Sequence, residues 1–168
     1  YKNLIERKKI EVIPIKIERG SLNIRKSIRT IYKLTKIFKK VGPDVVHNFG
    51  LRQIVHGSIS AKFAGVNKAF NSIIGLGSAF ISGNFILKFF IINLLRISLF
   101  FKNSQTLVQN KDDYIFFKKK IWIREKNLFL NSASGINLKK YTVSREPRGK
   151  IVFLFASRLL KDKGLLEL

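Results

Sequence analysis

Two cations near the carboxyl end of the chain are the residues best placed to bind a charged ligand. Arg158 and Lys163 follow the apolar run 151–155, and Gly164 comes directly after Lys163. We expect the run to be a buried strand and Gly164 to open the next element. In open α/β sheets, ligands bind beyond the carboxyl ends of the strands, where helix N-termini attract phosphate. A guanidinium and an ammonium at this place therefore predict a phosphate-binding site.

Four residues earlier in the chain are further candidates. The turn containing Gly75 and Gly77 has bare backbone that a ligand can approach closely, or it is a tight strand–helix connection. His47 follows a short apolar strand and either contacts an acceptor or phosphate or is a hydrogen-bonded structural residue. Asn110 stands at a strand–helix junction, where one of the aspartates at 112–113 is expected to cap the helix.

The composition excludes several kinds of site. The chain has no Cys, which rules out a disulfide, a thiol nucleophile and a Cys-based zinc site within this sequence. With only two His, a multi-His metal site is not expected, and we predict no metal and no cofactor. No paired carboxylates and no Ser-His-Asp set emerge, so the sequence identifies no catalytic residue.

Strands and helices alternate along the chain, which predicts an α/β fold with a Rossmann-like parallel sheet and flanking helices. Apolar residues at helical spacing predict helices over 27–40, 54–64 and 111–119. Short apolar or alternating runs predict strands over 10–17, 45–47, 69–74, 106–110, 127–130 and 151–155.

The charge is strongly positive, with 33 Lys and Arg against 10 Asp and Glu in 168 residues. Such a surface attracts nucleic acid, anionic lipid or phosphorylated substrates, although a Lys-rich genome alone would give the same excess. The first residues do not resemble a secretory signal. Because the chain contains no Met, we expect its natural N-terminus to lie outside this sequence.

Residues 79–101 form a long Phe-rich apolar segment interrupted by Lys88 and Arg96. The length would allow a membrane span, but each central charge costs about 2.5–3.5 kcal/mol on insertion scales. An amphipathic helix lying in the membrane interface fits better. An ordinary core helix and a transmembrane helix stay open as alternatives.

Six motifs, in the correct order, resemble those of family 4 glycosyltransferases of a bacterial polysaccharide branch. They are VGPDVVH at 41–47, GSISAKFAGV at 57–66, IGLGSAF at 74–80, VQNKDD at 108–113, ASGINL at 133–138 and ASRLLKDKG at 156–164. Three positions depart from the family pattern. Ser157 and Ala133 replace Gly, and Asn137 replaces Asp, which affects the turn and the hinge more than the chemistry.

The resemblance implies a fold and a domain organisation. The fold would be an incomplete GT-B fold, represented mainly by its N-terminal half. Residues 1–141 would be the Rossmann-like acceptor-side domain without its first strand, and residues 142–150 the interdomain linker. Residues 151–168 would begin the nucleotide-sugar-binding domain.

The resemblance also implies a function: retaining transfer of a hexosyl-type sugar from a nucleotide-sugar donor to a glycan or lipid-linked acceptor in cell-surface polysaccharide synthesis. Arg158, Lys163 and Gly164 would hold the donor diphosphate, while the turn at 75–77 would face the interdomain cleft. The enzyme would be cytoplasmic, peripheral on the inner face of an anionic membrane. We expect the 168-residue piece alone to be inactive.

Two other functions would also account for the basic charge. One is a nucleic-acid-binding module, although the Phe residues follow core periodicity and no nucleic-acid motif is present. The other is a membrane-associated domain without enzymatic activity. Salt-sensitive binding to DNA or RNA would favour the first, and resistance to salt extraction from membranes the second.

Overall fold

The computed structural model describes residues 5–15, 23–76, 85–101, 104–131, 135–145, 148–157, 159, 164 and 166. The chain divides into two compact units, Tyr1–Ala133 and Ser134–Leu168. The first unit carries the helices and strands that bear on the site. The boundary predicted at residue 141 stays a prediction.

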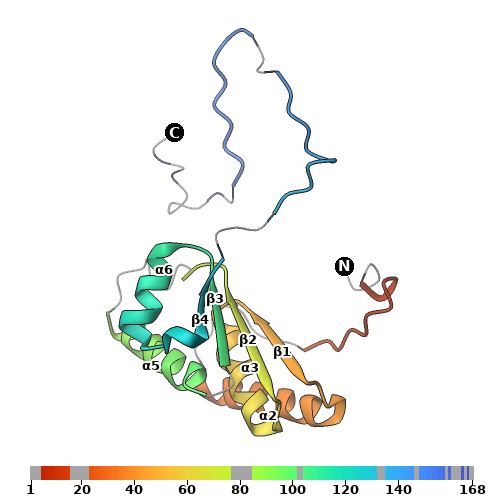
Figure 1. Cartoon of the computed structure of the whole chain (residues 1–168), viewed down its shortest axis with the longest axis vertical. Helices are drawn as coiled ribbons and strands as arrows, with labels where there is room; N and C mark the ends of the chain where they lie inside the picture. Colours follow the sequence, from red (N-terminus) through yellow and green to blue (C-terminus); the bar gives the residue numbers. More distant parts are fainter. Residues whose placement is uncertain are drawn as a thin grey trace. The chain divides into compact units, whose positions relative to one another are not determined.

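A parallel sheet forms the centre of the first unit (Figure 1). Its strands are β1 (Val45–Phe49), β2 (Lys68–Ile73), β3 (Ser104–Val108) and β4 (Leu128–Leu130). They are hydrogen-bonded in chain order, and every neighbouring pair is parallel. This arrangement confirms the predicted α/β class with a Rossmann-like parallel sheet and flanking helices.

Helices connect the strands, as parallel pairing requires, and one further helix precedes β1. They are α2 (Ile24–Val41), α3 (Leu51–Ala64), α5 (Phe85–Leu99), α6 (Lys111–Phe116), the π-helical turn η1 (Phe117–Ile121) and the 3-10 turn η2 (Glu125–Asn127). The ends of α2 follow from local chemistry. Asn23 caps its start by accepting from the Lys26 amide at 3.2 Å, and Gly42 ends it in the left-handed region at φ 62°.

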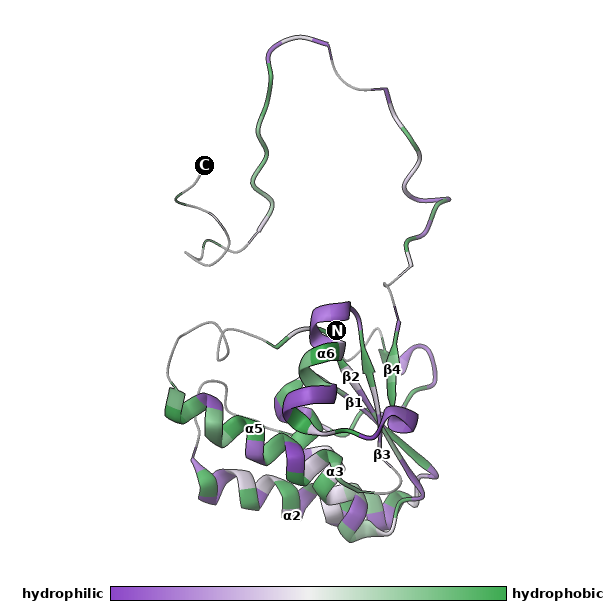
Figure 2. Ribbon diagram, turned by 60° about the vertical axis from the view of Figure 1, so that its left-hand side comes forward, coloured by the Kyte–Doolittle hydropathy of each residue, from purple (hydrophilic) through white to green (hydrophobic). Residues whose placement is uncertain are grey.

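The helices lie on one side of the sheet (Figure 2). The main core joins that face to α3, α5, η1 and the segment after η1. Its buried members are Ile54, Ile73, Leu95, Leu99, Val108, Phe117, Ile121, Ile123 and Leu128. A smaller cluster beside α2 contains Val46, Ala61, Val66 and Ala69. Among the described residues, side chains of β1 on the opposite face, such as Val45 and Phe49, are half exposed.

Two predicted strands are wrong as far as the structure describes them. Residues 10–15 have no strand structure, and residues 151–155 are unpaired, with Ile151 to Leu154 exposed by 81–85%. A strand needs a hydrogen-bonded neighbour, and no described segment pairs with either run. The apolar pattern of a run does not show whether such a neighbour exists. Residues 16 and 17 lie outside the described residues.

The Phe-rich segment contains α5, which begins at Phe85 and has 15 residues; residues 77–84 lie outside the described part. Within the described ranges, no helix is long and apolar enough to cross a membrane. The predicted helix over 111–119 is α6 followed directly by η1, so the helical turns widen after Phe116.

Candidate functional site

The carboxyl edge of the sheet brings two of the predicted residues together. Ile73 of β2 pairs with Val108 of β3, and both strands end at this pair. Gly75 and Asn110 each stand two residues further on, so they lie at the same edge on neighbouring strands. This is the edge at which open α/β sheets bind their ligands.

Glycine shapes the turn that follows β1. Gly50 has φ 84°, a conformation that other residues rarely adopt, and it lets α3 begin directly at Leu51. Its amide donates to the Ser72 carbonyl at 3.2 Å. The start of α3 is therefore fixed against the end of β2, at the carboxyl edge.

Gly75 follows β2 with φ 153°, which again favours glycine. Among the described residues, and apart from its two chain neighbours, no atom lies within 4 Å of the position that the Cβ of residue 75 would occupy. The described surroundings of Gly75 therefore leave space of the kind that a ligand approaching the backbone needs. Its companion Gly77 lies outside the described residues.

Asn110 caps α6. Its Oδ1 accepts from the Asp113 amide at 2.7 Å, and its Nδ2 donates to the Asp113 carboxylate at 3.0 Å. This reciprocal pair satisfies the helix start and buries Asp113. The expectation that Asp112 or Asp113 is the cap is wrong, because Asn110 takes that position. The cap uses one hydrogen bond at Oδ1 and one at Nδ2, so a ligand would have to bind the other hydrogen-bonding positions of the Asn110 side chain.

His47 lies within β1 on the face opposite the helices. Its Nε2 is 2.7 Å from the Ser72 hydroxyl, and its ring centroid is 4.1 Å from that of Phe49. The ring is also edge-on to Phe70, 6.0 Å away. His47 thus has the hydrogen-bonded neighbours expected of a structural residue and lies on an exposed face of the sheet, and its contact with an acceptor stays a prediction.

The sequence did not indicate a buried polar network that crosses the sheet from Asn48, near the end of β1, to Ser104 at the start of β3. Asn71 accepts from Asn48 and from the Ser58 hydroxyl, and it donates to the Ser104 hydroxyl, all at 2.9 Å. The network joins β1, β2, β3 and α3. Gly57 makes room for it, because a Cβ there would lie 1.9 Å from Asn48 Oδ1. The sequence feature that could have revealed this network is an Asn in each of two apolar strands.

His56 is a second histidine with a different environment. It is buried in α3, and its Nδ1 has no hydrogen-bond partner within the described structure. Burial, with a smaller contribution from the nearby Arg52 charge, lowers the pKa of His56 below its ordinary value of 6.5. The ring is therefore neutral near pH 7, as expected of a structural residue.

The predicted donor-diphosphate residues Arg158 and Lys163 lie outside the described residues. Gly164 is described and has φ 75°, a left-handed conformation that suits a turn. Their role as a diphosphate site stays a prediction. The described edge of the first unit offers hydrogen-bonding groups and open backbone, which can bind and orient a substrate.

Comparison with known proteins gives two findings. Residues 2–110 match the family described as glycosyl transferase 4-like. The chain is also 26% identical over 135 residues to a Campylobacter jejuni protein, the N,N'-diacetylbacillosaminyl-diphospho-undecaprenol alpha-1,3-N-acetylgalactosaminyltransferase. That alignment covers 79% of this chain and 35% of the relative. The chain therefore spans about a third of the length of this curated relative.

Proposed function

This chain belongs to the glycosyl transferase 4-like family, and on that premise we propose that it forms part of a retaining glycosyltransferase acting on a lipid-linked glycan. The observation that carries the proposal is the family match over residues 2–110, which includes the strands and turns of the carboxyl edge up to Asn110. The Campylobacter relative, whose name gives a diphospho-undecaprenol acceptor, supports an acceptor of the same class.

The acceptor would bind at the carboxyl edge of the first unit. Gly75 and Gly77 would allow the acceptor to approach the backbone closely. His47 would contact the acceptor through the ring nitrogen that Ser72 does not engage, and Asn110 would contribute its remaining hydrogen-bonding capacity. These contacts orient the acceptor hydroxyl, which is a large part of what catalysis of a two-substrate reaction needs.

The donor would bind to residues 151–168, which we propose as the beginning of a second, nucleotide-sugar-binding domain of a GT-B fold. Arg158 and Lys163 would hold the diphosphate, with Gly164 in the turn between them and the next element. As the glycosidic bond breaks, negative charge accumulates on the leaving nucleoside diphosphate. Two fixed cations stabilise that charge, so the reaction as we propose it uses no metal or other cofactor.

The enzyme would act at the cytoplasmic face of a membrane as a peripheral protein. A lipid-linked acceptor stays in the bilayer, so the protein must come to it. The excess of 33 cations over 10 carboxylates supports attraction to an anionic surface.

Charge-removing variants of the donor segment test the proposed function. In the full-length transferase of which we propose this chain to be part, we expect Arg158→Ala and Lys163→Ala each to lower kcat/KM for sugar transfer about 100-fold, as loss of a group that stabilises developing charge does. Lys161→Ala is the matched control, because it removes the same charge from the same segment at a position that the family motif leaves variable. Equal losses in all three variants would contradict the diphosphate site.

A further inference from the structure

Helix α5 presents an apolar face to solvent. Helices of globular proteins usually place polar residues on the outward face. The large apolar side chains exposed along α5 and at its end are Phe85, Ile86, Phe89, Phe90, Ile97 and Phe100. Three of them, Phe85, Ile86 and Phe100, are exposed by 79–80%. A continuous patch of this kind marks an interaction surface.

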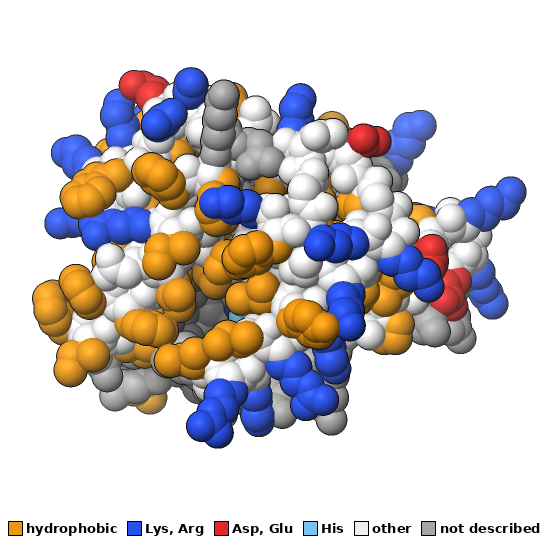
Figure 3. All heavy atoms as spheres, turned by 90° about the horizontal axis from the view of Figure 1, so that it is seen from below, with side chains coloured by type: hydrophobic (Ala, Val, Ile, Leu, Met, Phe, Trp, Pro, Cys, Tyr) orange, Lys and Arg blue, Asp and Glu red, His pale blue; other side chains and the backbone are white. Residues whose placement is uncertain are grey.

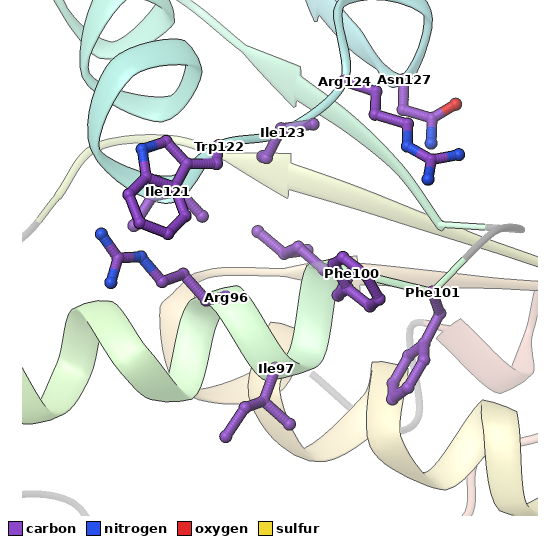
Figure 4. A pocket seen from close by; sticks show the side chains of 10 residues that line it. Arg96, Ile97, Phe100, Phe101, Ile121, Trp122, Ile123, Arg124 and Asn127 are labelled. Atoms are coloured by element: carbon purple, nitrogen blue, oxygen red, sulfur yellow. The ribbon is translucent and has the colours of Figure 1, made fainter.

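A tryptophan extends the patch beyond the end of α5. Trp122 follows η1 with φ 61° and is 70% exposed. The Arg96 guanidinium lies 4.0 Å from its ring centroid and donates to the Lys120 carbonyl at 2.8 and 3.0 Å (Figure 4). Arg96 therefore fixes the loop after η1 to α5 and holds the indole at the surface.

A hollow of about 420 Å³ separates the end of α5 from the segment after η1. Its walls are mainly apolar and include Ile97, Phe100, Ile123 and Trp122, and Arg124 lies at its margin. The surface thus combines exposed rings, an apolar hollow and guanidinium groups.

The charge around these apolar groups is almost entirely positive. The cations of α5, η1 and the segment up to residue 127 are Lys88, Arg96, Lys118, Lys119, Lys120, Arg124 and Lys126. The same stretches contain one carboxylate, Glu125, which is paired with Lys118 at 3.0 Å. Figure 3 shows hydrophobic side chains gathered on the side of α5, with Lys and Arg around them.

We propose that α5 and the η1 loop through Arg124 form the surface by which the protein docks onto an anionic phospholipid bilayer. Phe and Trp side chains enter the interfacial region, while the surrounding Lys and Arg contact lipid phosphates and are attracted by the negative surface of the bilayer. Exposed Phe and Ile side chains alone would fit a protein partner equally well. The surrounding cations favour an anionic lipid surface, because they can contact its phosphates.

The direction of α5 is compatible with a bilayer that also reaches the candidate site at the carboxyl edge. A helix that connects parallel strands runs back along the sheet, so its first turn lies towards the carboxyl edge and its last turn towards the amino edge. A bilayer along α5 would contact Phe85 near the site and Trp122 at the far end. The inference rests on the proposed function in one respect, that a lipid-linked acceptor lies in the same bilayer.

Vesicle sedimentation tests the surface directly. Vesicles of equal parts phosphatidylglycerol and phosphatidylcholine are used with the native protein and two variants, Phe85→Ser/Phe89→Ser and Lys119→Gln/Lys120→Gln. We expect the double Phe variant to lower the binding constant at least about tenfold, because two inserted rings are lost. The binding constant of the Lys variant should fall about fivefold for each charge removed. Phe63→Ser is the matched control, since Phe63 is 65% exposed but lies on α3, and it should bind like the native protein.

Several results would overturn the docking surface. Equal binding by all variants, or an equal loss in Phe63→Ser, would exclude it. So would a dimer that the Phe variant dissociates, or binding to single-stranded DNA that is lost in the same variants. Sugar transfer to a detergent-solubilised acceptor separates the two proposals. Variants that keep this transfer but bind vesicles like the native protein refute the docking surface and leave the proposed function standing.

Discussion

Asn48 and Asn71 are joined side chain to side chain beneath the carboxyl edge of the sheet, with Nδ2 of Asn48 donating to Oδ1 of Asn71 at 2.9 Å. Both residues are buried, and they face each other in the register of β1 and β2. Asn48 lies two residues before Gly50 and Asn71 four residues before Gly75. The pair therefore locks together the strands whose ends carry both glycine turns of the candidate site.

Asn71→Ala should destabilise the protein by about 2–4 kcal/mol, because it leaves up to three buried polar groups without their partner. Urea unfolding measures this change in the free energy of unfolding. Asn67→Ala, an exposed Asn in the connection just before β2, is the control and should change stability by less than about 0.5 kcal/mol. A loss in Asn71→Ala no larger than in this control would show that the network contributes nothing.

Gly57→Ala should also destabilise the protein, by about 1–3 kcal/mol, through overpacking against Asn48. The sign is informative, because Gly to Ala inside a helix otherwise stabilises by about 1 kcal/mol. Thermal unfolding of the single variants and of Gly57→Ala/Asn48→Ala gives the coupling between the two positions. The penalty of Gly57→Ala should shrink once Asn48 is Ala; an unchanged penalty would place the clash elsewhere.

Stability should fall as the pH is lowered through the titration range of His56. The unfolded chain takes up a proton near the ordinary pKa of 6.5, whereas burial lowers the pKa in the folded state. Below pH 6.5 the unfolded state therefore binds more protons, which favours unfolding until the folded pKa is also passed. The difference in urea midpoint between pH 7.5 and 5.5 should be smaller in His56→Gln than in the native protein. An identical difference in the two proteins would refute this assignment.

In the full-length transferase of which we propose this chain to be part, His47→Ala should lower kcat/KM for sugar transfer about tenfold or more while changing stability little, since the ring lies on an accessible face. Steady-state kinetics and urea unfolding measure the two effects separately. Val45→Ala is the control, because Val45 lies on the same strand and face and is half exposed. A stability loss without a loss of transfer would make His47 purely structural.

The fold was predictable because its elements are local and strongly patterned. Apolar spacing predicted helices within α2 and α3, and the short apolar runs predicted β1 to β4 to within a few residues. The predicted strands were wrong over the described residues 10–15 and 151–155 for a different reason. Pairing depends on a neighbour far away in the sequence, and apolar alternation contains no information about that neighbour.

The site was predictable only where one residue type has one use. Gly75 was predicted as a site residue because a bare backbone at a strand end suits ligand approach, and its contact with a ligand stays a prediction. Asn110 was identified, but its capping bond to Asp113 depends on the rotamers of both side chains. The Asn48–Asn71 pair was missed, because each Asn is unremarkable in the sequence until the strand register brings the two together.

The most direct test of the proposed function is the transfer of labelled sugar to a lipid-linked acceptor. The full-length transferase of which we propose this chain to be part is incubated with radiolabelled UDP-N-acetylgalactosamine, and then with other labelled nucleotide sugars, in vesicles containing an undecaprenyl-diphosphate-linked saccharide. We predict that label from one donor enters the organic phase, that Arg158→Ala abolishes nearly all of it, and that the new bond keeps the donor's anomeric configuration. Label that stays in water with every donor, or a lipid product with inverted configuration, would contradict the account.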